Sequence, residues 1–175
     1  MGTTTGIEWT HHTFNPWRGC TKVHAGCAHC YAETLSARNP KALGMWGKDG
    51  DRVIAAHSYW QLPRTWDRQA REAGEIRRVF CASLADVFEG VNSMPSSSWT
   101  SVRLARTRLW DIIDTTPNLL WLLLTKRPHN IIDMVPRHWL ARWPGNVMTG
   151  TSPCDQATAD RCIPCLLYTS PSPRD

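Results

Sequence analysis

A short segment near the start of the chain carries three cysteines, Cys20, Cys27 and Cys30, in the spacing C-x₆-C-x₂-C. Thiols grouped this tightly usually bind a metal ion or an iron–sulfur cluster, and such a ligand forces the backbone to turn around one point. Gly19 and Gly26 each precede a cysteine, and glycine permits the sharp turns that would bring the sulfurs together. This segment therefore constrains the fold more strongly than any other feature of the sequence.

The composition is that of a folded domain without membrane spans. The chain has 175 residues, of which 42% are hydrophobic, and a formal net charge of +5. This length is enough for one domain with a hydrophobic core. No apolar run approaches the roughly 18 residues of a membrane span, and the first residues lack a signal-peptide pattern. We expect a cytoplasmic protein with no membrane contact, in which grouped cysteines bind metal or act in catalysis rather than form disulfides.

The last part of the sequence is expected to be foreign to the protein. Residues 165–175 match the translation of a sequencing-library adapter, and such tails are excluded from reasoning about the fold. Residues 1–164 are then expected to be the N-terminal part of a barrel domain. Any enzymatic activity would belong to the full-length form, which this truncated chain need not share.

Apolar runs and helical patterns alternate along the chain. The predicted strands are residues 13–15, 78–83, 119–124 and 146–151, and the predicted helices are 31–38, 63–73, 99–114, 128–134 and 155–160. Ala32, Leu35 and Ala37 are placed on or near the buried side of the first helix, and one of the serines 96–98 is expected to cap the third. The alternation predicts an α/β fold with a parallel sheet of about four βα units.

Polar side chains recur where the predicted strands end. They are Ser83, Asp86, Lys126, Arg127, Thr151 and Ser152. In α/β barrels the carboxyl ends of the strands carry the chemistry, so these residues are candidates for ligand binding. Each has a plainer alternative: the serine, threonine and aspartate side chains can cap helices and shape turns, and the basic pair can lie in a solvated loop.

The remaining cysteines and a basic stripe have weaker claims to a function. Cys81 is expected to be a buried apolar thiol, and Cys154 and Cys162 are treated as incidental. Arg64, Arg68 and Arg71 share one face of a predicted helix. That stripe is either a solvated surface or a contact for phosphate groups.

The cysteine segment resembles the cluster loop of radical S-adenosylmethionine enzymes, whose commonest form is C-x₃-C-x₂-C, although the first gap here is longer. The chain is more closely similar to an uncharacterised phage and prophage family with a three-cysteine motif. The segments that carry this likeness are residues 7–10, 15–20, 30–33, 79–88 and 121–128.

The resemblance implies a fold, a cofactor and a reaction. The fold would be a truncated partial (βα) barrel of the TIM type, with Cys20, Cys27 and Cys30 holding a [4Fe-4S] cluster. The open iron would chelate S-adenosyl-L-methionine, and an electron donor would drive its cleavage to methionine and a 5′-deoxyadenosyl radical. The cofactor-binding candidates are His29 and the six polar residues at the strand ends. The substrate is not specified, and the basic stripe raises the hypothesis of a nucleic acid or nucleotide.

Spacing alone leaves the kind of metal site open. The same three cysteines could hold structural zinc with His24 or His29 as the fourth ligand, in a module that bridges partner proteins without catalysis. A third reading is a cluster used only for electron transfer or structure. Metal analysis separates the three readings.

Overall fold

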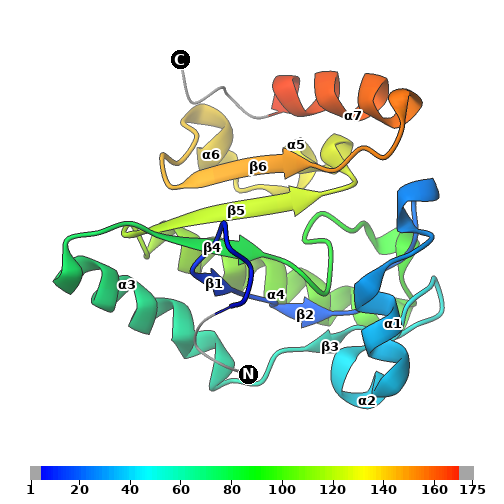
Figure 1. The fold of residues 1–175 in the computed structure, drawn as a ribbon, viewed down its shortest axis with the longest axis horizontal. Coiled ribbons are helices and arrows are strands. Elements are labelled where there is room, and N and C mark those ends of the chain that lie inside the picture. Colours follow the sequence, from blue (N-terminus) through cyan, green and yellow to red (C-terminus); the bar gives the residue numbers. More distant parts are fainter. Residues whose placement is uncertain (1–4, 170–175) are drawn as a thin grey trace.

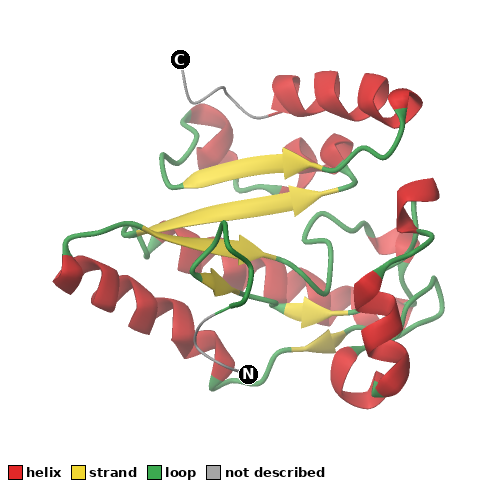
Figure 2. Ribbon diagram, in the orientation of Figure 1, coloured by secondary structure: helices red, strands yellow, loops and turns green. Residues whose placement is uncertain are grey.

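The central element is a four-stranded sheet in which every neighbouring pair of strands is parallel (Figures 1 and 2). The computed structural model describes residues 5–169. The strands, in spatial order, are β1 (His12–Thr13), β4 (Arg77–Cys81), β5 (Leu119–Thr125) and β6 (Val147–Thr151). The α/β class with a parallel sheet is thereby confirmed, whereas closure into a barrel stays a prediction.

A second, antiparallel pair of strands lies beside the cysteine segment. It consists of β2 (Trp17–Arg18) and β3 (Val53–Ile54). Neither segment was predicted as a strand, because two residues are too short to show a period. The pair ties the chain before Cys20 to the chain after residue 50.

Helices connect the parallel strands. Their bounds are α1 (Tyr31–Arg38), α2 (Pro40–Leu43), α3 (Leu62–Ala73), α4 (Ser96–Asp114), α5 (Ile131–Met134), α6 (Arg137–Ala141) and α7 (Gln156–Thr169). Four of the predicted helices, α1, α3, α4 and α5, agree with the structure to within three residues at either end. No helix within residues 5–169 is both long and apolar enough to cross a membrane.

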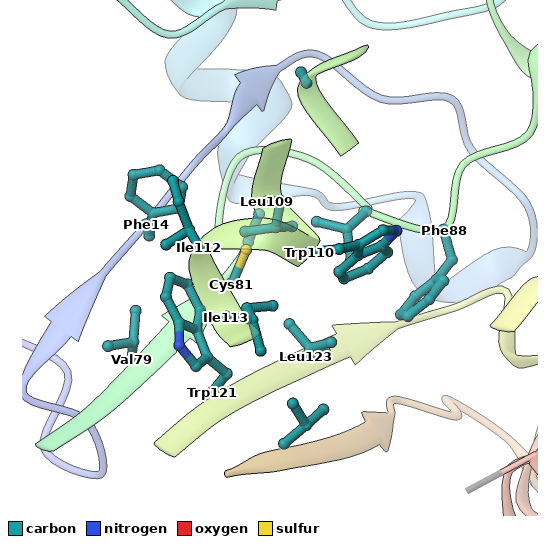
Figure 3. Packing of buried hydrophobic residues seen from close by; sticks show 14 of the residues in the cluster. Phe14, Val79, Cys81, Phe88, Leu109, Trp110, Ile112, Ile113, Trp121 and Leu123 are labelled. Carbon is teal, nitrogen blue, oxygen red and sulfur yellow. The ribbon is translucent and has the colours of Figure 1, made fainter. Parts of the chain in front are cut away.

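One face of the sheet packs against α4. Along β5 the residues alternate between buried and partly exposed, as expected when successive side chains point to opposite faces. Figure 3 shows the buried side chains from α4 and the strands together, and they include Val79, Cys81, Leu109, Ile112, Ile113, Trp121 and Leu123. Burial confirms Cys81 as an apolar core thiol and raises the pKa of its side chain. The alternate residues of β5 face away from this core.

Two local predictions were wrong. Leu35 is 40% exposed and Ala37 is also exposed, whereas the buried residues of α1 are Ala32 and Ser36. Ser36 takes the place of an apolar residue because its hydroxyl hydrogen-bonds to the carbonyl oxygen of Gly44.

The serine cap of α4 is also absent. Pro95 occupies the N-cap position of that helix and makes no side-chain cap. The hydroxyl of Ser97 donates to a carboxylate oxygen of Asp51 (2.6 Å), and that of Ser98 accepts from the backbone N–H of Arg52 (3.0 Å). These hydroxyls therefore bind residues 51 and 52 of the loop before β3.

Candidate functional site

The three cysteines line one cavity at the carboxyl ends of β4 and β5. Its volume is about 260 Å³. The predicted site residues that line it are Cys20, Cys27, His29, Cys30, Ser83, Asp86, Lys126, Arg127 and Ser152. Thr151 ends β6 but is not one of the lining residues. The fold thus gathers segments that lie more than 120 residues apart in the sequence around one space.

Gly19 positions the first cysteine. Its φ of +105° is one that L side chains rarely adopt, so this glycine makes the turn that the sequence predicted. Its backbone N–H donates to the carbonyl oxygen of Leu84 (3.0 Å), which fastens the start of the cysteine segment to the loop after β4.

Gly26 serves the segment in a different way. Its φ is not positive, but a Cβ at this position would lie 2.7 Å from the Cβ of Cys154. The cysteine segment therefore approaches the loop after β6 so closely that only glycine fits.

We expect Gly19→Ala to destabilise the fold by more than Gly74→Ala. Both glycines have positive φ, but a Cβ on Gly19 would also meet the carbonyl oxygen of Met45 at 2.8 Å, whereas Gly74 faces open space. A left-handed alanine alone costs about 1–2 kcal/mol, and the clash adds to that cost. Urea unfolding of the two variants measures the difference. Equal losses would show that the close packing around Gly19 does not constrain the chain.

A buried network of charges lies beneath the cavity. Glu89 is 0% exposed, and its carboxylate accepts two hydrogen bonds of 2.9 Å from the guanidinium of Arg52. Arg127 lies between two carboxylates, 2.9 Å from Asp86 and 3.5 Å from Glu89. The backbone N–H of Thr21 also donates to Glu89 (2.9 Å), so the network holds the residue that follows Cys20.

Asp86 joins the ends of two strands. Its carboxylate accepts hydrogen bonds from the hydroxyl of Thr125 (2.8 Å) and the backbone N–H groups of Lys126 (3.1 Å) and Phe88 (3.0 Å). The bond from Phe88 is a local turn contact, so Asp86 does shape a turn, as in the plainer alternative given for it from the sequence. The same carboxylate also accepts a hydrogen bond from the guanidinium of Arg127 (2.9 Å), which lines the cavity beside Cys20.

Cys20 is the cysteine most strongly influenced by its surroundings. The pKa of its thiol is raised to about 12, chiefly by burial and also by the charge of Glu89, while Arg127 opposes the shift. The guanidinium of Arg127 lies 3.7 Å from the sulfur. For Arg127 itself, burial lowers the pKa, but the charges of Asp86, Cys20 and Glu89 raise it overall. Without a bound metal, Cys20 is therefore a neutral thiol near a permanent cation.

This shift predicts slow alkylation of Cys20 in metal-free protein. The thiolate is the nucleophile, and a pKa of about 12 instead of the ordinary 9.0 leaves about a thousandfold less of it at pH 8. Mass spectrometry after timed treatment with iodoacetamide should show Cys20 reacting at least about tenfold more slowly in the folded chain than in urea, since the greater nucleophilicity of a more basic thiolate offsets part of its smaller amount. Equal rates would contradict the burial of this thiol.

Cys27 and Cys30 both lie just before α1. Cys27 ends a 3₁₀ turn, Ala25–Cys27, and Cys30 is the N-cap residue of the helix. Within the described part of the chain, no three His, Cys, Asp or Glu side chains are grouped so that they could hold a metal ion. The cysteines therefore share a cavity in this structure without being arranged as a closed set of ligands.

Cys154 lies against the cysteine segment, although the sequence analysis treated it as incidental. Its sulfur is 3.5 Å from Nδ1 of His24 and 3.6 Å from a carboxylate oxygen of Asp155. His24 Nδ1 also accepts the backbone N–H of Gly26 (3.1 Å). No local pattern could have revealed this contact, because it joins residues 130 positions apart.

The remaining candidates differ in how much of their hydrogen bonding is satisfied. Ser83 accepts a hydrogen bond from the side chain of Asn15 (3.1 Å), which also binds the backbone N–H of Leu84 (2.7 Å). Lys126 forms no salt bridge with any acidic side chain of residues 5–169. The hydroxyl of Ser152 is buried and has no hydrogen-bond partner in that same part of the chain. Lys126 and Ser152 are thus available to a ligand.

The basic stripe lies outside the cavity. Arg64, Arg68 and Arg71 are exposed on α3 and do not line the cavity. Arg68 is 3.9 Å from Glu72 in an exposed pair. Exposure of this kind suits both a solvated helix face and a contact for phosphate groups, so the choice between them stays a prediction.

Fold and site together define an α/β protein with a cysteine-lined cavity at the carboxyl edge of a parallel sheet. Residues 4–174 match a family model described as a protein of unknown function (DUF5131), and the chain belongs to this family. No curated protein and no solved structure matches the chain.

Proposed function

We propose that the chain is the iron–sulfur-binding part of a radical S-adenosylmethionine-like enzyme of phage or prophage origin. The observation that carries this proposal is that Cys20, Cys27 and Cys30 all line one cavity at the carboxyl edge of a parallel sheet. That edge is where α/β barrels place their chemistry. Within residues 5–169, these three are the cysteines that line the cavity, and three thiols suit a cluster with one open iron.

The donor set fits such a cluster in type. Cys20, Cys27 and Cys30 would hold it, and loading would have to draw their sulfurs closer together than they are in this structure. Arg127, fixed by Asp86 and Glu89, would place a permanent positive charge beside the thiolate of Cys20. When bound, the cluster supplies the electron that cleaves S-adenosylmethionine to methionine and a 5′-deoxyadenosyl radical.

The chain's own residues would bind and orient the cofactor. Lys126 offers an unneutralised ammonium group to a carboxylate, and Ser152 offers an unpartnered hydroxyl. Ser83 and Asp86 would act mainly by shaping the cavity wall, since both are already engaged within the protein. The role of the protein is thus to orient the cofactor and to exclude side reactions.

Anaerobic reconstitution with iron and sulfide tests the proposal. With dithionite and S-adenosylmethionine, the reconstituted protein should form 5′-deoxyadenosine, and Cys27→Ala protein treated in the same way should not. A sample that holds neither iron nor sulfide and forms no 5′-deoxyadenosine would exclude the enzyme.

A zinc site is the second candidate, because His29 lines the same cavity as the three cysteines and could supply a fourth ligand. It predicts about one zinc ion per chain that is retained in air. Iron without cleavage of S-adenosylmethionine would instead indicate a cluster used for electron transfer or structure.

A further inference from the structure

The face of the sheet opposite α4 carries an apolar groove. Phe80, Leu122 and Met148 are neighbours in register across β4, β5 and β6. Trp9 lines the groove together with them, and Gly150, which lacks a side chain, lies beside Leu124. The groove holds about 200 Å³ and shares Phe80 and Leu124 with the cysteine-lined cavity, so the two spaces adjoin.

Trp9 offers this groove a flat, accessible ring. The side chain is 46% exposed, and its ring centroid lies 4.9 Å from that of Phe80. The backbone next to it is held in place, because the hydroxyl of Thr10 (2.9 Å) and the N–H of His11 (3.0 Å) both donate to the carbonyl oxygen of Arg78. A fixed, half-exposed indole beside an apolar wall suits the stacking of a planar ring.

The other end of the combined space is polar and positively charged. Lys126 lines the cavity without an acidic partner within residues 5–169, and the buried hydroxyl of Ser152 is unpartnered there. An ammonium group of this kind favours an anion. Lys126 follows Leu122 by four residues, which corresponds to about 13 Å along a strand. A nucleoside monophosphate spans a comparable length from base to phosphate.

We infer that the groove and cavity together bind a nucleoside monophosphate, with the base against Trp9 and the phosphate at Lys126 and Ser152. Lys126 and Ser152 are the groups that the proposed function offers to the carboxylate of S-adenosylmethionine, so a nucleotide phosphate bound there would take the place of that cofactor. The inference therefore does not rest on the proposed function. As a binding site, it rests on the apolar groove, the half-exposed indole and the unneutralised lysine, which are independent of any metal.

Equilibrium dialysis of the anaerobically purified chain against each of the four common ribonucleoside monophosphates tests the inference. At least one should bind, and Trp9→Ala should raise its dissociation constant by about tenfold or more, the size expected for loss of one stacked base. Trp9→Phe should lose less affinity for the nucleotide than Trp9→Ala, since phenylalanine keeps an aromatic ring. Trp99→Ala is the matched control, because Trp99 is similarly exposed (42%) but lies on α4. Lys126→Ala should weaken the binding of both the nucleotide and inorganic phosphate, whereas Trp9→Ala should leave the binding of inorganic phosphate unchanged.

Three outcomes would overturn the inference: no binding of any of the four nucleotides, equal weakening by Trp9→Ala and Trp99→Ala, or an equal loss of affinity for S-adenosylmethionine in Trp9→Ala. The last result would assign the groove to the cofactor. Iron measured in the same samples separates the two proposals. Nucleotide binding by protein that takes up no iron would contradict the proposed function but support the nucleotide site. Iron uptake without nucleotide binding would support the iron–sulfur proposal but contradict the nucleotide site.

Discussion

Replacing Glu89 with alanine should lower the free energy of unfolding by about 3–5 kcal/mol, the usual cost of removing one partner from a buried ion pair. Glu89 is 0% exposed and is the common acceptor for Arg52, Arg127 and the backbone N–H of Thr21. Its loss would leave Arg52 buried without its carboxylate and would release the residue after Cys20. Urea unfolding followed by circular dichroism gives the measurement.

Two further variants make this result specific. Glu89→Gln keeps the side-chain shape and one acceptor oxygen, so its free energy of unfolding should fall by less than that of the alanine variant. Glu72→Ala removes an exposed partner of Arg68 at 3.9 Å, and such surface pairs contribute about 0–1 kcal/mol. If Glu89→Ala and Glu72→Ala proved equally mild, the buried network would not be a major support of the fold.

The second large effect is expected on iron content. Cys20→Ala, Cys27→Ala and Cys30→Ala should each remove most of the bound iron from anaerobically reconstituted protein, because a cluster held by three thiolates cannot spare one. Iron per chain, together with the visible absorption of the cluster, gives the measurement.

Cys154→Ser is the matched control for these variants. Its sulfur lies beside the same segment, 3.5 Å from His24, but does not line the cavity. The control should therefore keep its iron. Loss of iron in Cys154→Ser to the same extent as in the other variants would show that the ligand set was assigned wrongly.

The sequence predicted the features of this protein that depend on local pattern. Strand β5 was found because it is an almost continuous apolar run, and β4 because apolar residues follow its two arginines. The polar residues after both strands were placed at the edge of the sheet by the rules of parallel sheets. Gly19 was recognised as a turn residue because it directly precedes a cysteine. These signals lie within a few neighbouring residues.

The features that the sequence missed depend on pairing over long distances. The bond between Arg52 and Glu89 joins residues 37 positions apart, and neither residue lies in a segment with a clear period. The approach of Cys154 to Gly26 requires the loop after β6 to fold back over the cysteine segment. The missing serine cap has a similar cause, since Ser97 and Ser98 bind residues 51 and 52, on the loop before β3. In each case tertiary contact decided what the local pattern left open.

The central claim is that three thiols hold an iron–sulfur cluster while leaving one iron free for a small molecule. Mössbauer spectroscopy of protein reconstituted with ⁵⁷Fe, recorded with and without S-adenosylmethionine, tests this claim most directly. The account predicts the spectrum of a [4Fe-4S] cluster in which a single iron site changes when S-adenosylmethionine is added. Protein that takes up no iron, or a cluster spectrum that S-adenosylmethionine leaves unchanged, would contradict it.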